Sequence, residues 1–314
     1  MVFATKDETS TYPRRRIGSI IKCREGDLKN VILFILIMLV IIVGLRCEKN
    51  ENPFKPDSER FVYPIQIGYR WIYTRTLSDS NLRPLTPKAR SVGDTTASYQ
   101  VRIEIARRET IHDSIETHVF QEILTDESGQ TFESETYYAN LDSGLYLFAY
   151  CGPGQIIPKS RNGVQIYFKG MFFPSVHALV SSFTNLSLGL ACLEDSLTYE
   201  TPPLRSIAYP LEVGAQWTYR YPGEPCRIDK KVVGRGMEVV PAGELQCFQI
   251  QWLLDMDRDG EWDDDIIFYD YIADIGLVKR YALFKDCVII GEDDPEPIGV
   301  CDILEESVLT GFYH

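Results

Sequence analysis

Apolar and polar residues alternate along much of the chain beyond about residue 60. Residues 99–105, 119–124 and 247–252 are rich in β-branched and aromatic side chains, and apolar and polar positions alternate in them. A period of two is typical of a half-buried antiparallel strand. No sustained stretch in this region has the period of an amphipathic helix. The pattern therefore predicts a mainly β fold.

One eleven-residue phrase occurs twice, at residues 63–73 and 209–219. Both copies place Tyr, Pro, Gly, Trp and Tyr at the same positions, and similar turn residues follow each copy in the same order. Such self-similarity indicates the duplication of one structural unit. We expect two tandem antiparallel β-sheet modules, half-barrel or sandwich-like, at residues 61–205 (with the inter-module region) and 206–314.

The aromatic residues of the repeated phrase are candidates for the core of each module. They are Trp71 and Tyr73 in the first copy, and Trp217 and Tyr219 in the second. A tryptophan in the opening strand of a β module usually fills the core. The alternative is that these rings are exposed and stack on sugars or line an apolar groove.

The strongest apolar run precedes the β region. Residues 31–45 contain no polar side chain. This length matches the apolar part of a signal peptide and is shorter than the roughly 20 residues of a comfortable bilayer span. We assign residues 1–30 to a cytoplasmic basic segment, 31–46 to a signal or transmembrane segment, and 47–60 to a linker.

Cys47 follows the apolar run and opens the polar linker. This arrangement resembles the signal of bacterial lipoproteins, in which such a cysteine is lipidated, although Arg46 stands where those signals have a small residue. Three outcomes stay open: lipidation at Cys47, an uncleaved membrane anchor, or cleavage and secretion. Each places residues 48–314 outside the cytoplasm, in the bacterial cell envelope or periplasm.

The charge distribution fits an exported protein that does not bind nucleic acid. The whole chain has a formal net charge of −13, and residues 48–314 contain 24 basic and 41 acidic side chains. Such a surface repels phosphate backbones. The excess of acidic residues is otherwise explained by solubility.

Six cysteines follow the membrane segment and its adjoining Cys47. An even number outside the cytoplasm favours disulfide bonds, with 15 possible connectivities. The simplest pairing is sequential, and the alternative is buried free thiols. The sequential pairs are Cys151–Cys192, Cys226–Cys247 and Cys287–Cys301.

One acidic segment has the spacing of a calcium loop. Asp255, Asp257, Asp259 and Asp263 occupy positions 1, 3, 5 and 9, Gly260 allows a tight turn at position 6, and Glu261 follows it. Calcium requires several converging oxygen ligands. We therefore expect a structural calcium ion here, and the alternative is a solvated acidic hairpin tip. Apart from calcium, no cofactor is expected.

Three segments of the second module form a recognisable series. Residues 239–243 contain Pro-Ala-Gly, residues 247–250 follow closely, and residues 275–280 contain Gly-Leu-Val-Lys. With the Pro–Gly–Trp–Tyr opening, they resemble an uncharacterised class of bacterial envelope lipoproteins. The resemblance implies a fold similar to half-barrel lipid or lipoprotein carriers, and it assigns no catalytic residues.

Enzymatic signatures are missing from the sequence. The chain has four histidines and contains no nucleophile elbow, zinc-protease, phosphate-loop or dinucleotide motif. We expect a non-catalytic, membrane-anchored envelope protein that acts as a scaffold or binds an envelope partner. The alternatives are a carrier of an apolar ligand or lipid, and a calcium-stabilised carbohydrate-binding protein.

Overall fold

The structure is a computed structural model. It describes residues 61–87, 96–112, 114–151, 164–176, 178–180, 197–221, 226–291 and 294–314. Residues 60–314 form one compact unit, which is described by itself below. The predicted membrane segment at residues 31–46, Cys47 and the linker lie outside the described residues. Within the ranges given above, no helix is both long enough and apolar enough to cross a bilayer.

The fold consists mainly of antiparallel strands, which we divide into two halves. The first half comprises β1 (Arg70–Pro84), β2 (Thr96–Ile111), β3 (Ile115–Asp126), β4 (Thr131–Leu141), β5 (Gly144–Cys151) and β8 (Thr198–Ala208). The second half comprises β9 (Gln216–Arg220), β10 (Arg227–Val240), β11 (Gly243–Asp255), β12 (Ile266–Ala273), β13 (Gly276–Gly291) and β14 (Asp294–Tyr313). A short hairpin of β6 (Val164–Phe168) and β7 (Met171–Phe173) pairs with β13.

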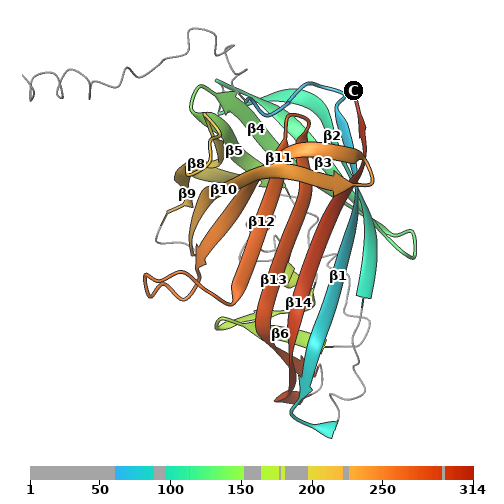
Figure 1. Ribbon diagram of the computed structural model, residues 1–314. Helices are drawn as coiled ribbons and strands as arrows, with labels where there is room; N and C mark the ends of the chain where they lie inside the picture. Colours follow the sequence, from blue (N-terminus) through green and yellow to red (C-terminus); the bar gives the residue numbers. More distant parts are fainter. Residues whose placement is uncertain are drawn as a thin grey trace, which may run out of the picture. The chain divides into compact units, whose positions relative to one another are not determined.

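The strands form one continuous sheet in the order β8-β5-β4-β3-β2-β1-β14-β13-β12-β11-β10-β9. The sheet curls so that its edge strands β8 and β9 lie next to each other, which gives a nearly closed, barrel-like shape to this unit (Figure 1). The predicted mainly β, antiparallel fold is confirmed. Both halves belong to this one sheet, because β1 and β14 pair from Arg70↔Tyr313 to Pro84↔Gly299 and join them. The two tandem modules stay a prediction.

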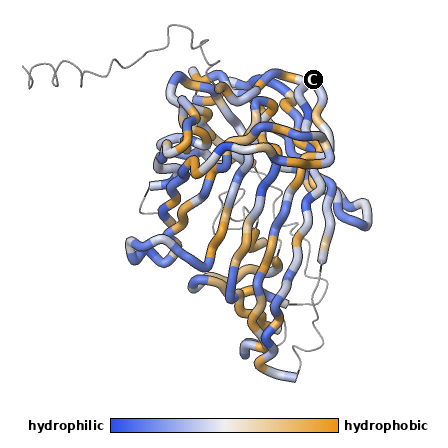
Figure 2. The backbone as a smooth tube through the Cα atoms, viewed as in Figure 1, coloured by the Kyte–Doolittle hydropathy of each residue, from blue (hydrophilic) through white to orange (hydrophobic). Residues whose placement is uncertain are grey.

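Alternation of side chains explains how the sheet encloses its core. Along β1, Trp71, Tyr73, Arg75 and Leu77 are buried, and the residues between them are only half-buried. Hydrophobic and hydrophilic positions alternate in the same way along other strands (Figure 2). Successive side chains of a strand point to opposite faces, so one face of the curled sheet becomes the interior. Arg75 shows that this interior includes charged residues.

The edge strands β8 and β9 are joined through side-chain contacts and not through a ladder of backbone hydrogen bonds. The indole Nε1 of Trp217 donates a hydrogen bond to the carbonyl oxygen of Arg205 at 2.9 Å. Arg220 Nη2 lies 2.7 Å from a carboxylate oxygen of Glu200. These contacts hold the two edge strands together and complete the enclosure.

The repeated phrase has the same local hydrogen bonds in both halves. In the first half, Gly68 N donates to Ile105 O and Ile105 N donates to Tyr69 O. In the second half, Gly214 N donates to Val232 O and Val232 N donates to Ala215 O. The four aromatic residues predicted for the core are all buried: Trp71, Tyr73, Trp217 and Tyr219.

The tyrosines that open the two phrases each contact the other half. Leu277 N, at the start of β13, donates to Tyr63 Oη at 3.3 Å. Tyr209 Oη donates to the side-chain oxygen of Asn140, near the end of β4, at 2.7 Å. The predicted module boundary at residues 205 and 206 falls inside β8, and the duplication itself stays a prediction.

Candidate functional site

A cavity of about 180 Å³ lies inside the curled sheet. Every strand on the main path of the sheet, from β8 round to β9, contributes at least one side chain to its wall. Aromatic and aliphatic residues supply much of this wall, and ionisable side chains supply the rest. The ionisable residues other than tyrosine are Arg75, Glu122, Lys230, Asp270, Arg280 and Glu305.

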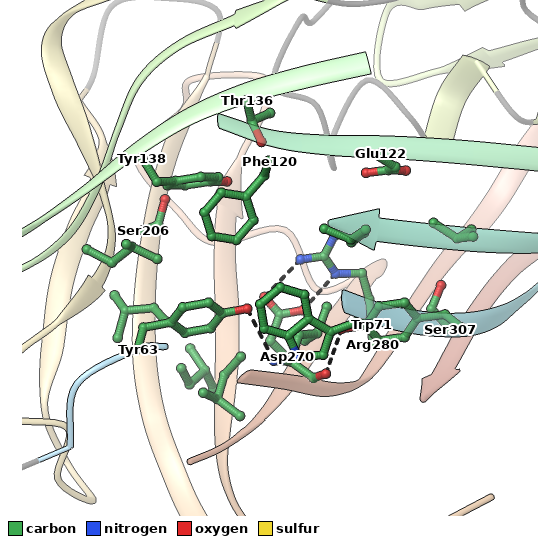
Figure 3. Close-up of a pocket in the computed structure, with 18 of the residues that line it drawn as sticks. Tyr63, Trp71, Phe120, Glu122, Thr136, Tyr138, Ser206, Asp270, Arg280 and Ser307 are labelled. Carbon is green, nitrogen blue, oxygen red and sulfur yellow. Dashed lines mark hydrogen bonds and ion pairs between the residues drawn. The ribbon is translucent and has the colours of Figure 1, made fainter. Parts of the chain in front are cut away.

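Asp270 and Arg280 form an ion pair in the cavity wall, with two contacts between their side chains. Arg280 Nε and Nη2 lie 2.7 and 3.1 Å from the two carboxylate oxygens of Asp270, and these residues are cross-strand partners on β12 and β13. The indole of Trp252 donates a further hydrogen bond to Asp270 at 2.9 Å. Figure 3 shows the paired groups between the ring of Trp71 and the strands behind it. A two-point charged pair of this kind has fixed geometry.

Arg75 and Glu305 form a second, less complete pair. Arg75 Nε lies 2.9 Å from Glu305 Oε1, and Ser307 Oγ donates to the same oxygen. Both side chains are almost fully buried, at 5% and 1% exposure. Arg75 Nη2 and Glu305 Oε2 have no hydrogen-bond partner. Buried polar atoms without partners are costly, so these two atoms favour a hydrogen bond from a group that enters the cavity.

Lys230, on β10, is a buried cation between two aromatic rings. Its Nζ lies 4.1 Å from the ring centre of Tyr219 and 3.7 Å from that of Trp252. It donates a hydrogen bond to the carbonyl oxygen of Ser206 at 3.1 Å. Burial lowers the pKa of Lys230 to about 7, although Asp270 favours the charged form. The ring faces stabilise the ammonium only partly.

Glu122, on β3, contributes a carboxylate to the cavity wall. Removal from solvent raises the pKa of Glu122, and Arg75 and Arg280 oppose that shift. Among the described residues, no ion pair within 4.0 Å and no hydrogen bond is found for this carboxylate. Figure 3 shows Glu122 on the opposite side of the view from Ser206 and Tyr138.

The sequence analysis identified only part of this site. Trp71, Tyr73 and Tyr219 were predicted as core residues, and they also line the cavity. The charged residues of the wall were not predicted. A signal was present, because Glu122 and Lys230 occupy inward positions of alternating strands, where apolar residues are expected.

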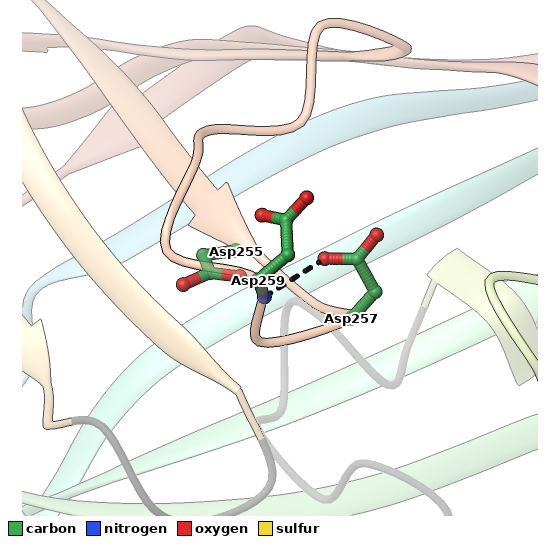
Figure 4. Close-up of side chains that lie close together, drawn as sticks. All are labelled: Asp255, Asp257 and Asp259. Carbon is green, nitrogen blue, oxygen red and sulfur yellow. Dashed lines mark hydrogen bonds between the residues drawn. The ribbon is translucent and has the colours of Figure 1, made fainter.

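The predicted calcium ligands are partly brought together at the end of β11. Carboxylate oxygens of Asp255, Asp257 and Asp259 lie within 4.8 Å of one another (Figure 4). Asp255 is 5% exposed, and its Oδ1 has no hydrogen-bond partner. This buried acceptor next to two exposed carboxylates fits the ligand chemistry of a hard cation.

The two remaining predicted ligands are placed differently. Asp263 Oδ1 pairs with Lys169 Nζ at 2.7 Å, and its other oxygen accepts a hydrogen bond from Met256 N. Glu261 is outside the group of three and donates its backbone N–H to Asp259. The structure therefore supports three of the five predicted carboxylates as a cluster.

No disulfide bond is found among the described cysteines, which are Cys151, Cys226, Cys247, Cys287 and Cys301. The predicted Cys226–Cys247 bond does not occur. Cys226 precedes β10, whereas Cys247 pairs with Gly236 ten residues further along, which corresponds to roughly 33 Å of strand. Cys287 and Cys301 are direct cross-strand partners, but the predicted bond between them is not found either. Cys192 lies outside the described residues.

Comparison with known proteins gives a distant likeness of fold. No family model matches the chain, and no curated protein matches it. A presumed exported protein with a YmcC-like fold from Bacteroides fragilis is 15% identical, with 81% of this chain and 100% of that chain covered and a TM-score of 0.34. A presumed lipoprotein from Parabacteroides distasonis is 13% identical, with 81% and 99% covered and a TM-score of 0.35. Likenesses at this level carry no conclusion about function.

Proposed function

We propose that this protein is a non-catalytic binding protein of the bacterial envelope, anchored through its N-terminal segment, which holds a small ligand inside the curled sheet. The observation that supports the proposal is the internal cavity, lined from all sides of the sheet and containing buried polar atoms without partners. Binding sites combine an apolar wall with a few placed polar groups, as this cavity does. The two halves of the sheet are proposed to descend from one duplicated unit.

The cavity favours a small polar ligand over a lipid. Its volume of about 180 Å³ is below the roughly 300–1,000 Å³ of sites for drug-sized ligands. An apolar ligand would also leave Arg75, Glu122, Lys230 and Glu305 without new partners in a dry site. The scaffold and carbohydrate-binding alternatives remain predictions, since neither accounts for these interior groups.

Native mass spectrometry of the full-length protein, with and without a blocked cavity, tests the proposal. Thr136 lines the cavity, whereas Thr131 is exposed on the same strand, β4. Thr136→Phe should remove a small-molecule adduct from the protein as isolated, and Thr131→Phe should retain it. A wild-type protein without any adduct, or an adduct retained in Thr136→Phe, would contradict ligand binding in this cavity.

A further inference from the structure

Two of the six charged groups around the cavity form no ion pair within 4.0 Å among the described residues. Asp270 pairs with Arg280, and Arg75 lies next to Glu305. Lys230 and Glu122 remain, and within the described part of the chain neither has an ion-pair partner within 4.0 Å. More distant charges compensate them only in part: Asp270 acts on Lys230, and Arg75 and Arg280 act on Glu122. A buried charge without a direct partner is unfavourable, so each of these two groups favours an external counter-charge.

The two unpaired charges come from matching places in the two halves. The repeated hydrogen bonds align Ile105 with Val232. Two residues before Ile105, Ile103 pairs across the strands with Glu122. Two residues before Val232, Lys230 pairs with Trp252. The matching cross-strand pair therefore supplies a carboxylate on one strand in the first half and an ammonium on the other strand in the second half.

Apolar side chains share the cavity wall with these two charges. Trp71, Phe120, Ile250 and Leu277 all line the same cavity as Glu122 and Lys230. In Figure 3, Glu122 lies on one side of the view, and Ser206, whose carbonyl accepts from Lys230, lies on the other, with the rings of Phe120 and Trp71 between them. The wall thus presents the Glu122 carboxylate and the Lys230 ammonium together with apolar surface, and its other charged groups, Asp270 with Arg280 and Arg75 with Glu305, are paired with each other.

We propose that the cavity binds a small amphoteric molecule with an ammonium group at one end and a carboxylate at the other. This inference rests on the proposed binding function. The ligand ammonium meets the Glu122 carboxylate, the ligand carboxylate meets the Lys230 ammonium, and the carbon chain between them contacts the apolar wall. A ligand with one charge would leave the other protein charge unpaired. A zwitterion compensates both and keeps the site electrically neutral.

Isothermal titration calorimetry on the full-length protein in detergent tests this at neutral pH. The probes are ω-amino acids of increasing length, from glycine through γ-aminobutyrate to ε-aminocaproate. Matched controls are butyrate, butylamine and butanol. We expect one chain length to bind best, and γ-aminobutyrate to bind at least about tenfold more tightly than either singly charged control.

Two variants assign the ends of the ligand. Lys230→Met should remove the advantage of γ-aminobutyrate over butylamine and preserve its advantage over butyrate. Glu122→Gln should give the reverse result. Equal binding of zwitterion, amine and carboxylate, or equal effects of both variants on all probes, would overturn the ligand class. Binding of butanol that Thr136→Phe abolishes would then leave the proposed binding function intact, whereas binding of no probe by a folded protein would count against both.

Discussion

In the first half of the sheet, the cross-strand pair Ile103–Glu122 faces the cavity, and in the second half the matching pair is Lys230–Trp252. The surrounding backbone hydrogen bonds are the same in both halves. The comparison shows that one backbone arrangement tolerates an acid in one copy and a base in the other. The two halves share their turns and buried aromatic residues, whereas the differing pair changes the charge that each half presents to the cavity.

The largest expected effect tests whether the shared tryptophans are equivalent. Trp71 and Trp217 are buried, and their indoles donate to the carbonyl oxygens of Ile275 and Arg205. Replacing either with alanine should lower the free energy of unfolding by about 3–5 kcal/mol, as for other buried aromatic truncations. Urea unfolding followed by circular dichroism measures this. A small loss for Trp217→Ala with a large loss for Trp71→Ala would break the equivalence.

The hairpins β3–β4 and β11–β12 provide a second comparison, because only the latter contains the aspartate cluster. Calcium at a hundred times its dissociation constant should raise the free energy of unfolding by about 2.7 kcal/mol. Asp255→Asn should remove this response in thermal unfolding with calcium or chelator. Asp126 accepts hydrogen bonds from Ser128 N and Gln130 N in the first hairpin, so Asp126→Asn is the control and should leave the calcium response unchanged. If added calcium leaves the melting temperature of the wild-type protein unchanged, the predicted calcium site is wrong.

The glycines that open β5 and β13 should differ in their tolerance of a side chain. A Cβ at Gly144 would collide with the carbonyl oxygen of Ile207, whereas at Gly276 it would lie 3.0 Å from Tyr63 Oη and 3.1 Å from Trp71 Nε1. Overpacking costs about 1–3 kcal/mol, and the backbone neighbour of Gly144 has less freedom to move. Chemical denaturation should therefore show a larger loss for Gly144→Ala than for Gly276→Ala. The opposite order would mean that the Tyr63 and Trp71 contact is the more rigid one.

The smallest effect concerns the two unpaired interior charges. Lys230→Met and Glu122→Gln should each stabilise the unliganded protein at neutral pH by about 1–2 kcal/mol, since each removes a buried charge that has no direct ion-pair partner. Asp270 and Arg280 face Lys230, and Arg75, Arg280 and Glu305 face Glu122; all are retained in both variants.

The pH dependence of these two variants should have opposite signs. The pKa of Lys230 is lowered to about 7 in the folded protein. The burial cost of its charged form is therefore complete below pH 7 and disappears as the pH rises towards the ordinary lysine value of about 10.4. The pKa of Glu122 is raised, so its cost grows as the pH rises from the ordinary glutamate pKa to that raised value and is complete above it. Unfolding free energies from about pH 4 to 10 should show the Lys230→Met gain shrinking at high pH and the Glu122→Gln gain shrinking at low pH.

Much of the fold could be predicted because it depends on local patterns. Alternation predicted the antiparallel strands, and the repeated phrase predicted where β1 and β9 would place their tryptophans. The pairing of β1 with β14 could not be predicted, since these strands are more than two hundred residues apart and no local signal links them. That pairing turns two predicted modules into one sheet.

The sequence by itself determined the composition of the interior, including an acid at Glu122 and a base at Lys230 on inward positions of their strands. It also determined the spacing of Asp255, Asp257 and Asp259, which a single turn suffices to bring together. Only the tertiary structure decided that Glu122 and Lys230 line one cavity. Their meeting requires closure of the sheet from β8 to β9, and closure is a property of all the strand pairings together.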